Sequence, residues 1–176
     1  IVSWWERSGA ASRFSLLFRP HPRDREWRER FRAATFRDDA AVQEPSFTDL
    51  ETLAVLLQHG DVVVSNAGTI LLDALVNDRP AVCVLYDEGA PPGESWALKN
   101  VSGEHYRSLI ESDAFYRADD FDQVVSGIER ALEHPAVDES ARHWFGNRVR
   151  QIPALPTGVI DCGWLEESLK KSSPSV

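Results

Sequence analysis

Short apolar runs alternate with segments of helical spacing along most of this chain, and this alternation limits the fold more than any other feature. The runs predicted as strands are residues 13–18, 41–46, 61–66, 81–86 and 114–118. Helices are predicted between and after them, at residues 24–34, 49–60, 102–112 and 119–135, with one more in the stretch 65–80 after a turn at Gly68. Strands separated by helices of this length predict right-handed crossovers and a mostly parallel sheet. We therefore expect an α/β fold with a Rossmann-like, doubly wound parallel sheet.

The composition is that of an ordinary globular protein, with 43% hydrophobic and 27% charged residues among 176. We expect an α/β domain over residues 1–136 and a helical tail over residues 137–176. The formal net charge of −9 repels nucleic-acid backbones, so no nucleic-acid partner is expected. Cys83 and Cys162 lack zinc-binding spacing, which favours reduced, structural thiols in a reducing compartment.

The chain begins with "IVSWWERSGAA", which has the pattern of a helix already under way, and it contains no Met. We therefore expect a piece of a longer protein. No signal peptide or membrane-spanning run is recognisable, so a cytoplasmic location is expected.

In doubly wound sheets, ligands bind beyond the carboxyl ends of the strands. Four loops qualify, namely "RPHPRD" at residues 19–24, "PSFTD" at 45–49, "SNAGT" at 65–69 and "YDEGAPPGES" at 86–95. These loops are the first place to look for functional side chains.

The stretch "SNAGT" connects a strand to a helix and suits a phosphate. Free backbone N–H groups at the start of the helix, a small Gly68, and the hydroxyl groups of Ser65 and Thr69 favour an anion. Asp73 follows one helical turn later, where a carboxylate can accept hydrogen bonds from ribose hydroxyls. The alternative is a plain turn followed by a helix charge that pairs with Arg79.

The loop "RPHPRD" places His21 between two prolines, with Arg19 and Arg23 on either side. A rigid basic loop in an acidic chain suits an anionic ligand, and histidine serves as donor or base near neutral pH. The alternative is a structural turn whose arginines are solvated.

The remaining loops offer weaker candidates. Phe47 can stack on a nucleobase or serve as a hydrophobic staple before a helix capped by Ser46 or Thr48. Acidic residues that can contact a sugar, or simply be solvated, are Asp87, Glu88 and Glu94. The spacing supports no Ser-His-Asp set, and no metal or cofactor is expected.

Taken together, "LLFRPHPRD" and "DVVVSNAGTILLDALVNDRPAVCVLYD" resemble the C-terminal, donor-binding half of GT-B-type glycosyltransferases. The similarity extends over about residues 13–135. The nearest resemblance is to CDP-glycerol glycerophosphotransferases, with their K-P-H-P loop, and to UDP-N-acetylglucosamine 2-epimerases, with their D-S-G-G motif. It implies a transferase of cell-envelope polysaccharide synthesis that binds a nucleotide-sugar or CDP-alditol donor.

By this resemblance, His21 is the catalytic histidine near the donor phosphates and Asp73 is the ribose-binding acid. The diphosphate would contact residues of both loops, namely Arg19, Arg23, Ser65, Asn66, Gly68 and Thr69. The sequence departs from the families in three places. Asn66 replaces an Asp, Arg19 replaces a Lys, and the paired Glu-Glu of the epimerases becomes Leu72-Asp73.

Three hypotheses follow. The first is the donor-binding portion of a transferase, inactive alone, whose acceptor site lies in a missing N-terminal domain. That missing part would also provide any association with the inner face of the membrane, and the helical tail would pack on it or on the present domain. The second is a UDP-sugar 2-epimerase-like enzyme. The third is a non-catalytic interaction module, with an interface marked by the terminal tryptophans Trp4, Trp5, Trp144 and Trp164.

Overall fold

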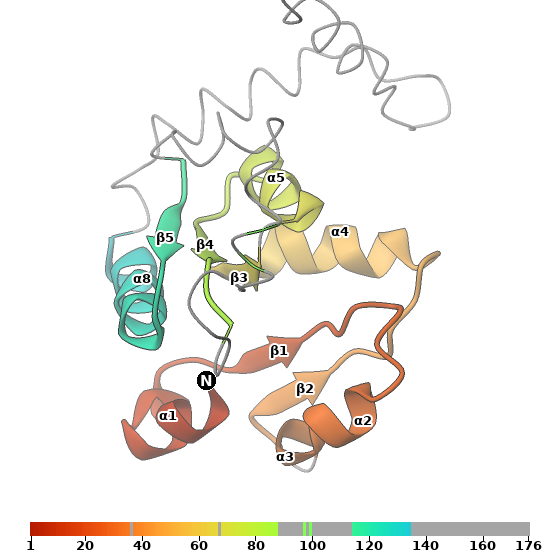
Figure 1. The fold of residues 1–176 in the computed structure, drawn as a ribbon, viewed down its shortest axis with the longest axis horizontal. Helices are drawn as coiled ribbons and strands as arrows, with labels where there is room; N and C mark the ends of the chain where they lie inside the picture. Colours follow the sequence, from red (N-terminus) through yellow and green to blue (C-terminus); the bar gives the residue numbers. More distant parts are fainter. Residues whose placement is uncertain (36, 67, 88–96, 98, 100–113, 135–176) are drawn as a thin grey trace, which may run out of the picture. The chain divides into compact units, whose positions relative to one another are not determined.

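The computed structural model describes residues 1–35, 37–66, 68–87, 97, 99 and 114–134 (Figure 1). The described residues form an α/β fold with two small parallel sheets, one of two strands and one of three. The chain divides into two compact units, Ile1–Leu53 and Ala54–Val176, called unit 1 and unit 2 below. The boundary predicted at residue 136 lies outside the described residues.

Unit 1 contains the two-stranded sheet. Helix α1 (Val2–Arg7) ends before Gly9, whose φ of 79° is favourable for glycine, and the 3-10 helix η1 (Ala10–Ser12) follows. Strand β1 (Leu16–Phe18) then pairs in parallel with β2 (Ala40–Val42), with Phe18 opposite Val42 (Figure 1). Both strands are shorter than predicted, but their parallel pairing is as expected.

The core of unit 1 is built around Trp5, which has an exposed fraction of 0%. Its indole Nε1 donates a hydrogen bond to the Phe14 carbonyl at 2.9 Å, so the polar end of this buried ring is satisfied. The half-buried Trp4 packs against Phe14, with ring centroids 6.2 Å apart. Trp5 is therefore a core residue and offers no surface to a partner, contrary to the interface hypothesis. Trp144 and Trp164 lie outside the described residues.

The helix predicted at residues 24–34 is two short helices, α2 (Trp27–Arg30) and α3 (Arg32–Thr35). The break falls at Phe31, where φ is −102° and ψ is 14°. The Phe31 ring lies 5.2 Å from that of Phe18 in β1. A contact with the sheet thus accompanies the break in the helix.

Helix α4 (Leu50–His59) begins after Asp49 and ends at Gly60, as the sequence predicts. The cap is neither Ser46 nor Thr48. Instead, the Asp49 Oδ1 atom accepts the N–H of Thr52, the third residue of the helix, at 3.1 Å. Ser46 Oγ accepts the N–H groups of Thr48 and Asp49 one turn earlier.

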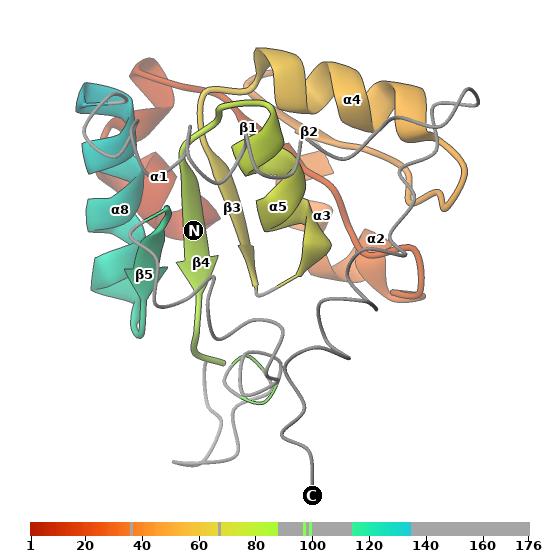
Figure 2. The same ribbon diagram turned by 90° about the horizontal axis from the view of Figure 1, so that it is seen from above.

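Unit 2 contains the three-stranded parallel sheet, in the order β3-β4-β5. Its strands are β3 (Val63–Asn66), β4 (Ala81–Val84) and β5 (Tyr116–Ala118). Helix α5 (Thr69–Val76) packs on β3 and β4, and α8 (Phe121–Glu133) packs on β4 and β5 (Figure 2). Asp120 caps α8, with its Oδ1 accepting the Gln123 N–H at 2.8 Å.

The central strand β4 is buried on both faces, as its continuous apolar run predicts. Three successive residues, Ala81, Val82 and Cys83, have an exposed fraction of 0%. Because successive side chains point to opposite faces, both faces of this strand are covered. Cys83 is a free, buried thiol, and burial raises its pKa to about 11, in agreement with a structural role. Cys162 lies outside the described residues.

Candidate functional site

The loops that follow β1 and β2 leave the same edge of the unit 1 sheet, because the two strands are parallel. This arrangement brings together two predicted residues. The His21 ring stands edge-on to the Phe47 ring, with centroids 6.4 Å apart and an interplanar angle of 89°. Such a geometry is favourable for an aromatic pair. Phe47 is 65% exposed, so one face of this pair is open to a ligand.

The His21 ring is oriented by its own loop. Its Nδ1 atom accepts the backbone N–H of Arg23 at 3.2 Å. Since Nδ1 is an acceptor, the neutral ring has its proton on Nε2. Because His21 is an exposed residue, this Nε2–H can donate to a ligand, and the resemblance implies that the histidine lies near the donor phosphates.

The two arginines of the loop differ in their surroundings. The Arg19 guanidinium donates to Gln43 Oε1 at 2.5 Å and to the Asp49 carbonyl at 3.5 Å. Arg23 is exposed, and its guanidinium has no hydrogen-bond or ion-pair partner among the described residues. Of these two predicted phosphate ligands, Arg23 is the one whose donors are available.

Gln43 and Asp49 are polar residues of this edge that the sequence analysis did not single out. The Gln43 Nε2 atom donates to Asp49 Oδ2 at 3.1 Å while its Oε1 accepts from Arg19. Hydrogen bonds from Thr52 are the main reason that the pKa of Asp49 lies below its ordinary value. Two features of the sequence could have identified these residues. Gln43 is a polar amide directly after an apolar run, and Asp49 is an acid directly before a helix.

In unit 2, the predicted phosphate loop lies at the carboxyl end of β3. Asn66 pairs with Val84, so this loop is next to the segment that follows β4. Ser65 is half-buried, and Asn66 and Thr69 are exposed. Gly68 is extended, with φ −167° and ψ 169°, and an added Cβ would lie 3.7 Å from the Asn66 carbonyl oxygen. The backbone therefore does not itself require glycine here, and Ala67 lies outside the described residues.

Asp73 is half-buried one turn into α5. Its carboxylate has no hydrogen-bond or ion-pair partner among the residues that the structure describes, and burial raises its pKa. The predicted alternative, an ion pair with Arg79, is not formed. The Arg79 guanidinium instead donates to the carbonyl groups of Leu57, at 3.1 Å, and Gln58 near the end of α4. Partial burial of the ionised Asp73 carboxylate, one turn into α5, therefore contributes unfavourably to the stability of the folded protein.

Of the predicted sugar contacts, Asp87 is described and half-buried, and its Oδ2 accepts the N–H of Ala97 at 3.2 Å. Glu88 and Glu94 lie outside the described residues. Within the described part of the chain, no group of three or more His, Cys, Asp or Glu side chains is arranged to hold a metal ion. No described helix has the length and apolar character needed to cross a membrane.

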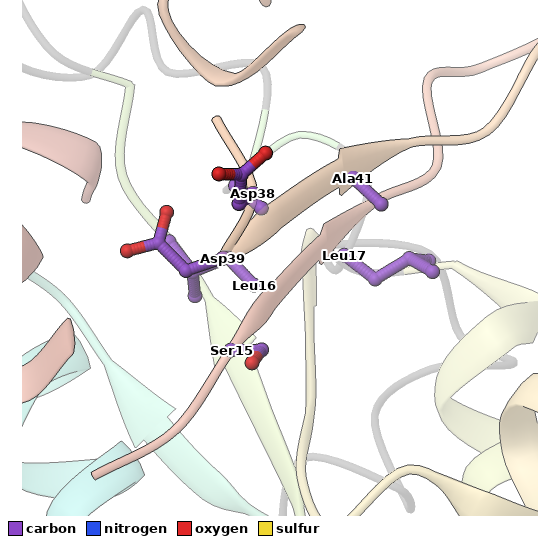
Figure 3. Close-up of a pocket in the computed structure, with 7 residues that line it drawn as sticks. Ser15, Leu16, Leu17, Asp38, Asp39 and Ala41 are labelled. Atoms are coloured by element: carbon purple, nitrogen blue, oxygen red, sulfur yellow. The ribbon is translucent and has the colours of Figure 1, made fainter. Parts of the chain in front are cut away.

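Two hollows in unit 1 lie away from the predicted site. One, of about 210 Å³, is at the amino ends of β1 and β2, the edge opposite the His21 loop (Figure 3). Its lining residues are Ser15, Leu16, Leu17, Asp38, Asp39, Ala40 and Ala41. The other, of about 310 Å³, lies between α2 and α3 beside Trp27. The contacts of the predicted site in unit 1 lie instead at the opposite, carboxyl ends of β1 and β2, where the His21 and Phe47 rings meet.

Comparison with known protein families, curated proteins and solved structures finds no match to this chain.

Proposed function

We propose that this chain is the donor-binding portion of a GT-B-type glycosyl- or glycerophosphotransferase, with a Rossmann-like, doubly wound domain as its framework. The donor would be a nucleoside diphosphate sugar or a CDP-alditol. His21 and Arg23 would contact the phosphates and stabilise negative charge on the departing nucleotide. Asp73 would accept hydrogen bonds from the ribose, and Phe47 would stack on the base.

The observation that most supports the proposal is the state of Asp73. Burying a carboxylate without a partner is unfavourable, and a structural charge would be expected to have a counter-ion. Arg79, the obvious candidate, is engaged elsewhere. A ribose with two hydroxyl groups would supply the missing donors, at the distance from the helix start that the resemblance implies.

The His21 loop gives independent support from unit 1. It presents an Nε2–H donor and a guanidinium with no partner among the described residues, and the adjacent loop adds the exposed Phe47 ring. These are the groups that a phosphate and a nucleobase require.

A thermal-shift screen tests the proposal. UDP, CDP, GDP and their sugar or glycerol conjugates are titrated against the wild type, His21→Ala and Asp73→Ala, with Asp61→Asn at an exposed acid as the control. A ligand at about 100 times its Kd stabilises the folded state by about 2.7 kcal/mol. We expect a shift in the wild type and the control that is much reduced in both site variants.

The absence of any shift in the folded wild type would reject the proposal, as would full responses from both site variants. Conversion of a UDP-sugar by this chain without an acceptor would favour the epimerase hypothesis instead.

A further inference from the structure

We infer that Arg19 is a positioning residue, which holds the His21 and Phe47 loops together and leaves contact with the anionic ligand to Arg23. The inference rests on the proposed function, because it assigns roles within that donor site. It concerns three residues of unit 1, Arg19, Gln43 and Asp49, which we call the Arg19 clamp.

The contacts of the clamp form a closed set. Arg19 donates to Gln43 Oε1 and to the Asp49 carbonyl, and Gln43 Nε2 donates to Asp49 Oδ2. The amide of Gln43 therefore uses its acceptor on one partner and its donor on the other. All three residues are half-buried, so these bonds are partly shielded from water.

The clamp fixes the Phe47 loop at both ends. Gln43 continues the strand pairing, with its N–H donating to the Phe18 carbonyl at 2.9 Å. Asp49 caps helix α4 through the N–H of Thr52. Phe47 lies between these two anchored residues, so the clamp restricts where its ring can be.

The clamp also restricts His21. Only the buried Pro20 separates His21 from Arg19, and the proline ring fixes φ at that residue. Pro22 follows, and the Arg23 N–H bonds the imidazole itself. The backbone between Arg19 and His21 therefore has little freedom, and the position of the His21 imidazole beside Phe47 depends on where Arg19 is held.

Direct contact of Arg19 with a phosphate would compete with the bonds to Gln43 and Asp49. Arg23 has no such competition, since its guanidinium has no partner among the described residues. The division of roles follows from this difference between the two arginines.

Substitution of Gln43 by Met separates the two roles of Arg19, because it changes neither charge nor chain length. If Arg19 positions the loops, Gln43→Met weakens binding of the nucleoside diphosphate that stabilises the wild type, whether UDP, CDP or GDP, by about tenfold. If Arg19 contacts the ligand, the variant releases its guanidinium, and binding is unchanged or tighter. That second outcome would overturn the inference. Gln58→Met, at an exposed glutamine of α4, is the matched control and should bind like the wild type.

A readout without ligand keeps the two proposals distinguishable. The NMR spectra of the wild type and Phe47→Leu are compared first. The difference between them gives the shift that the Phe47 ring causes in the His21 ring-proton resonances. We expect Gln43→Met and Arg19→Lys to move these resonances toward their positions in Phe47→Leu. Unchanged resonances in both variants would contradict the positioning role, even if nucleotides bind. If no nucleotide binds the wild type, the proposed function fails, and the resonances still decide whether the clamp holds the two rings together.

Discussion

At the residue scale, Asp73 is where stability and the proposed function oppose each other. Burial raises its pKa above the ordinary 3.8, so the ionised carboxylate is less stable in the folded protein than in the unfolded chain. A residue kept in such a position, with no partner among the described residues, is expected to serve a ligand.

Asp73→Asn is therefore expected to raise the melting temperature at neutral pH. As the pH falls through the raised pKa toward 3.8, the wild-type carboxyl takes up a proton in the folded state first. Protonation removes the cost of the buried charge, so the advantage of the Asn variant should shrink over that range. Differential scanning calorimetry as a function of pH measures this difference, and an advantage that grows on acidification would contradict the assignment.

Trp5 gives the opposite case, a residue whose role is structural. Trp5→Phe removes the hydrogen bond to the Phe14 carbonyl and leaves part of the core unfilled. We expect a loss of about 2–4 kcal/mol in the free energy of unfolding, measured by urea denaturation. Trp4→Phe is the control, since Trp4 is half-buried, and equal losses in the two variants would show that Trp5 is not the centre of this core.

At the element scale, the contact of α8 with the sheet depends on Gly127. A Cβ atom at this position would lie 3.2 Å from both methyl groups of Val82 and 3.4 Å from Tyr116 Cβ. Gly127→Ala should therefore destabilise unit 2 by about 1–3 kcal/mol despite the better helix propensity of alanine.

The neighbouring exposed Ser126 provides the control, because Ser126→Ala changes propensity without a contact to the sheet. Thermal unfolding of the two variants compares them directly. The packing of α8 on β4 would be in doubt if Gly127→Ala were as stable as Ser126→Ala.

The elements themselves were largely predictable from the sequence where one local signal determines them. The buried run at β4, the Gly60 terminus of α4 and the first turn of α8 are of this kind. The break at Phe31 was not predictable, because it accompanies a contact with Phe18, a residue remote in sequence. The sequence analysis placed the cap of α4 at Ser46 or Thr48, before the true cap at Asp49. Ser, Thr and Asp can all cap a helix, and all three occur within these four residues, so the sequence alone does not decide between them.

The residues and loops of the candidate site remain a prediction from the sequence, whereas the contacts that the structure shows among them could not be predicted. A basic loop predicts that Arg19 and Arg23 both face an anion, yet Arg19 is engaged by Gln43 from another strand end. The alternative pairing of Asp73 with Arg79 is not formed for a similar reason, because Arg79 donates to carbonyl groups near the end of α4. Spacing along the chain identifies candidates, whereas partners far apart in sequence decide between them.

At the scale of the whole molecule, charge is divided unevenly along the chain. Residues 1–53 contain equal numbers of basic and acidic side chains, so the formal net charge of −9 belongs to residues 54–176. The proposed phosphate contacts His21 and Arg23 thus lie in the unit without a net negative charge. As the proposed donor-binding portion of a transferase, the chain is expected to bind a donor without turnover.

Calorimetric titration with matched ligands measures the proposed phosphate and ribose contacts separately. The nucleoside diphosphate that stabilises the wild type is compared with its 2′,3′-dideoxy analogue, in the wild type, His21→Ala and Asp73→Asn. We predict that His21→Ala weakens both ligands, whereas Asp73→Asn weakens the natural nucleotide by about tenfold and leaves the dideoxy analogue unaffected. Equal effects of Asp73→Asn on the two ligands, or no binding by the folded wild type, would contradict the account.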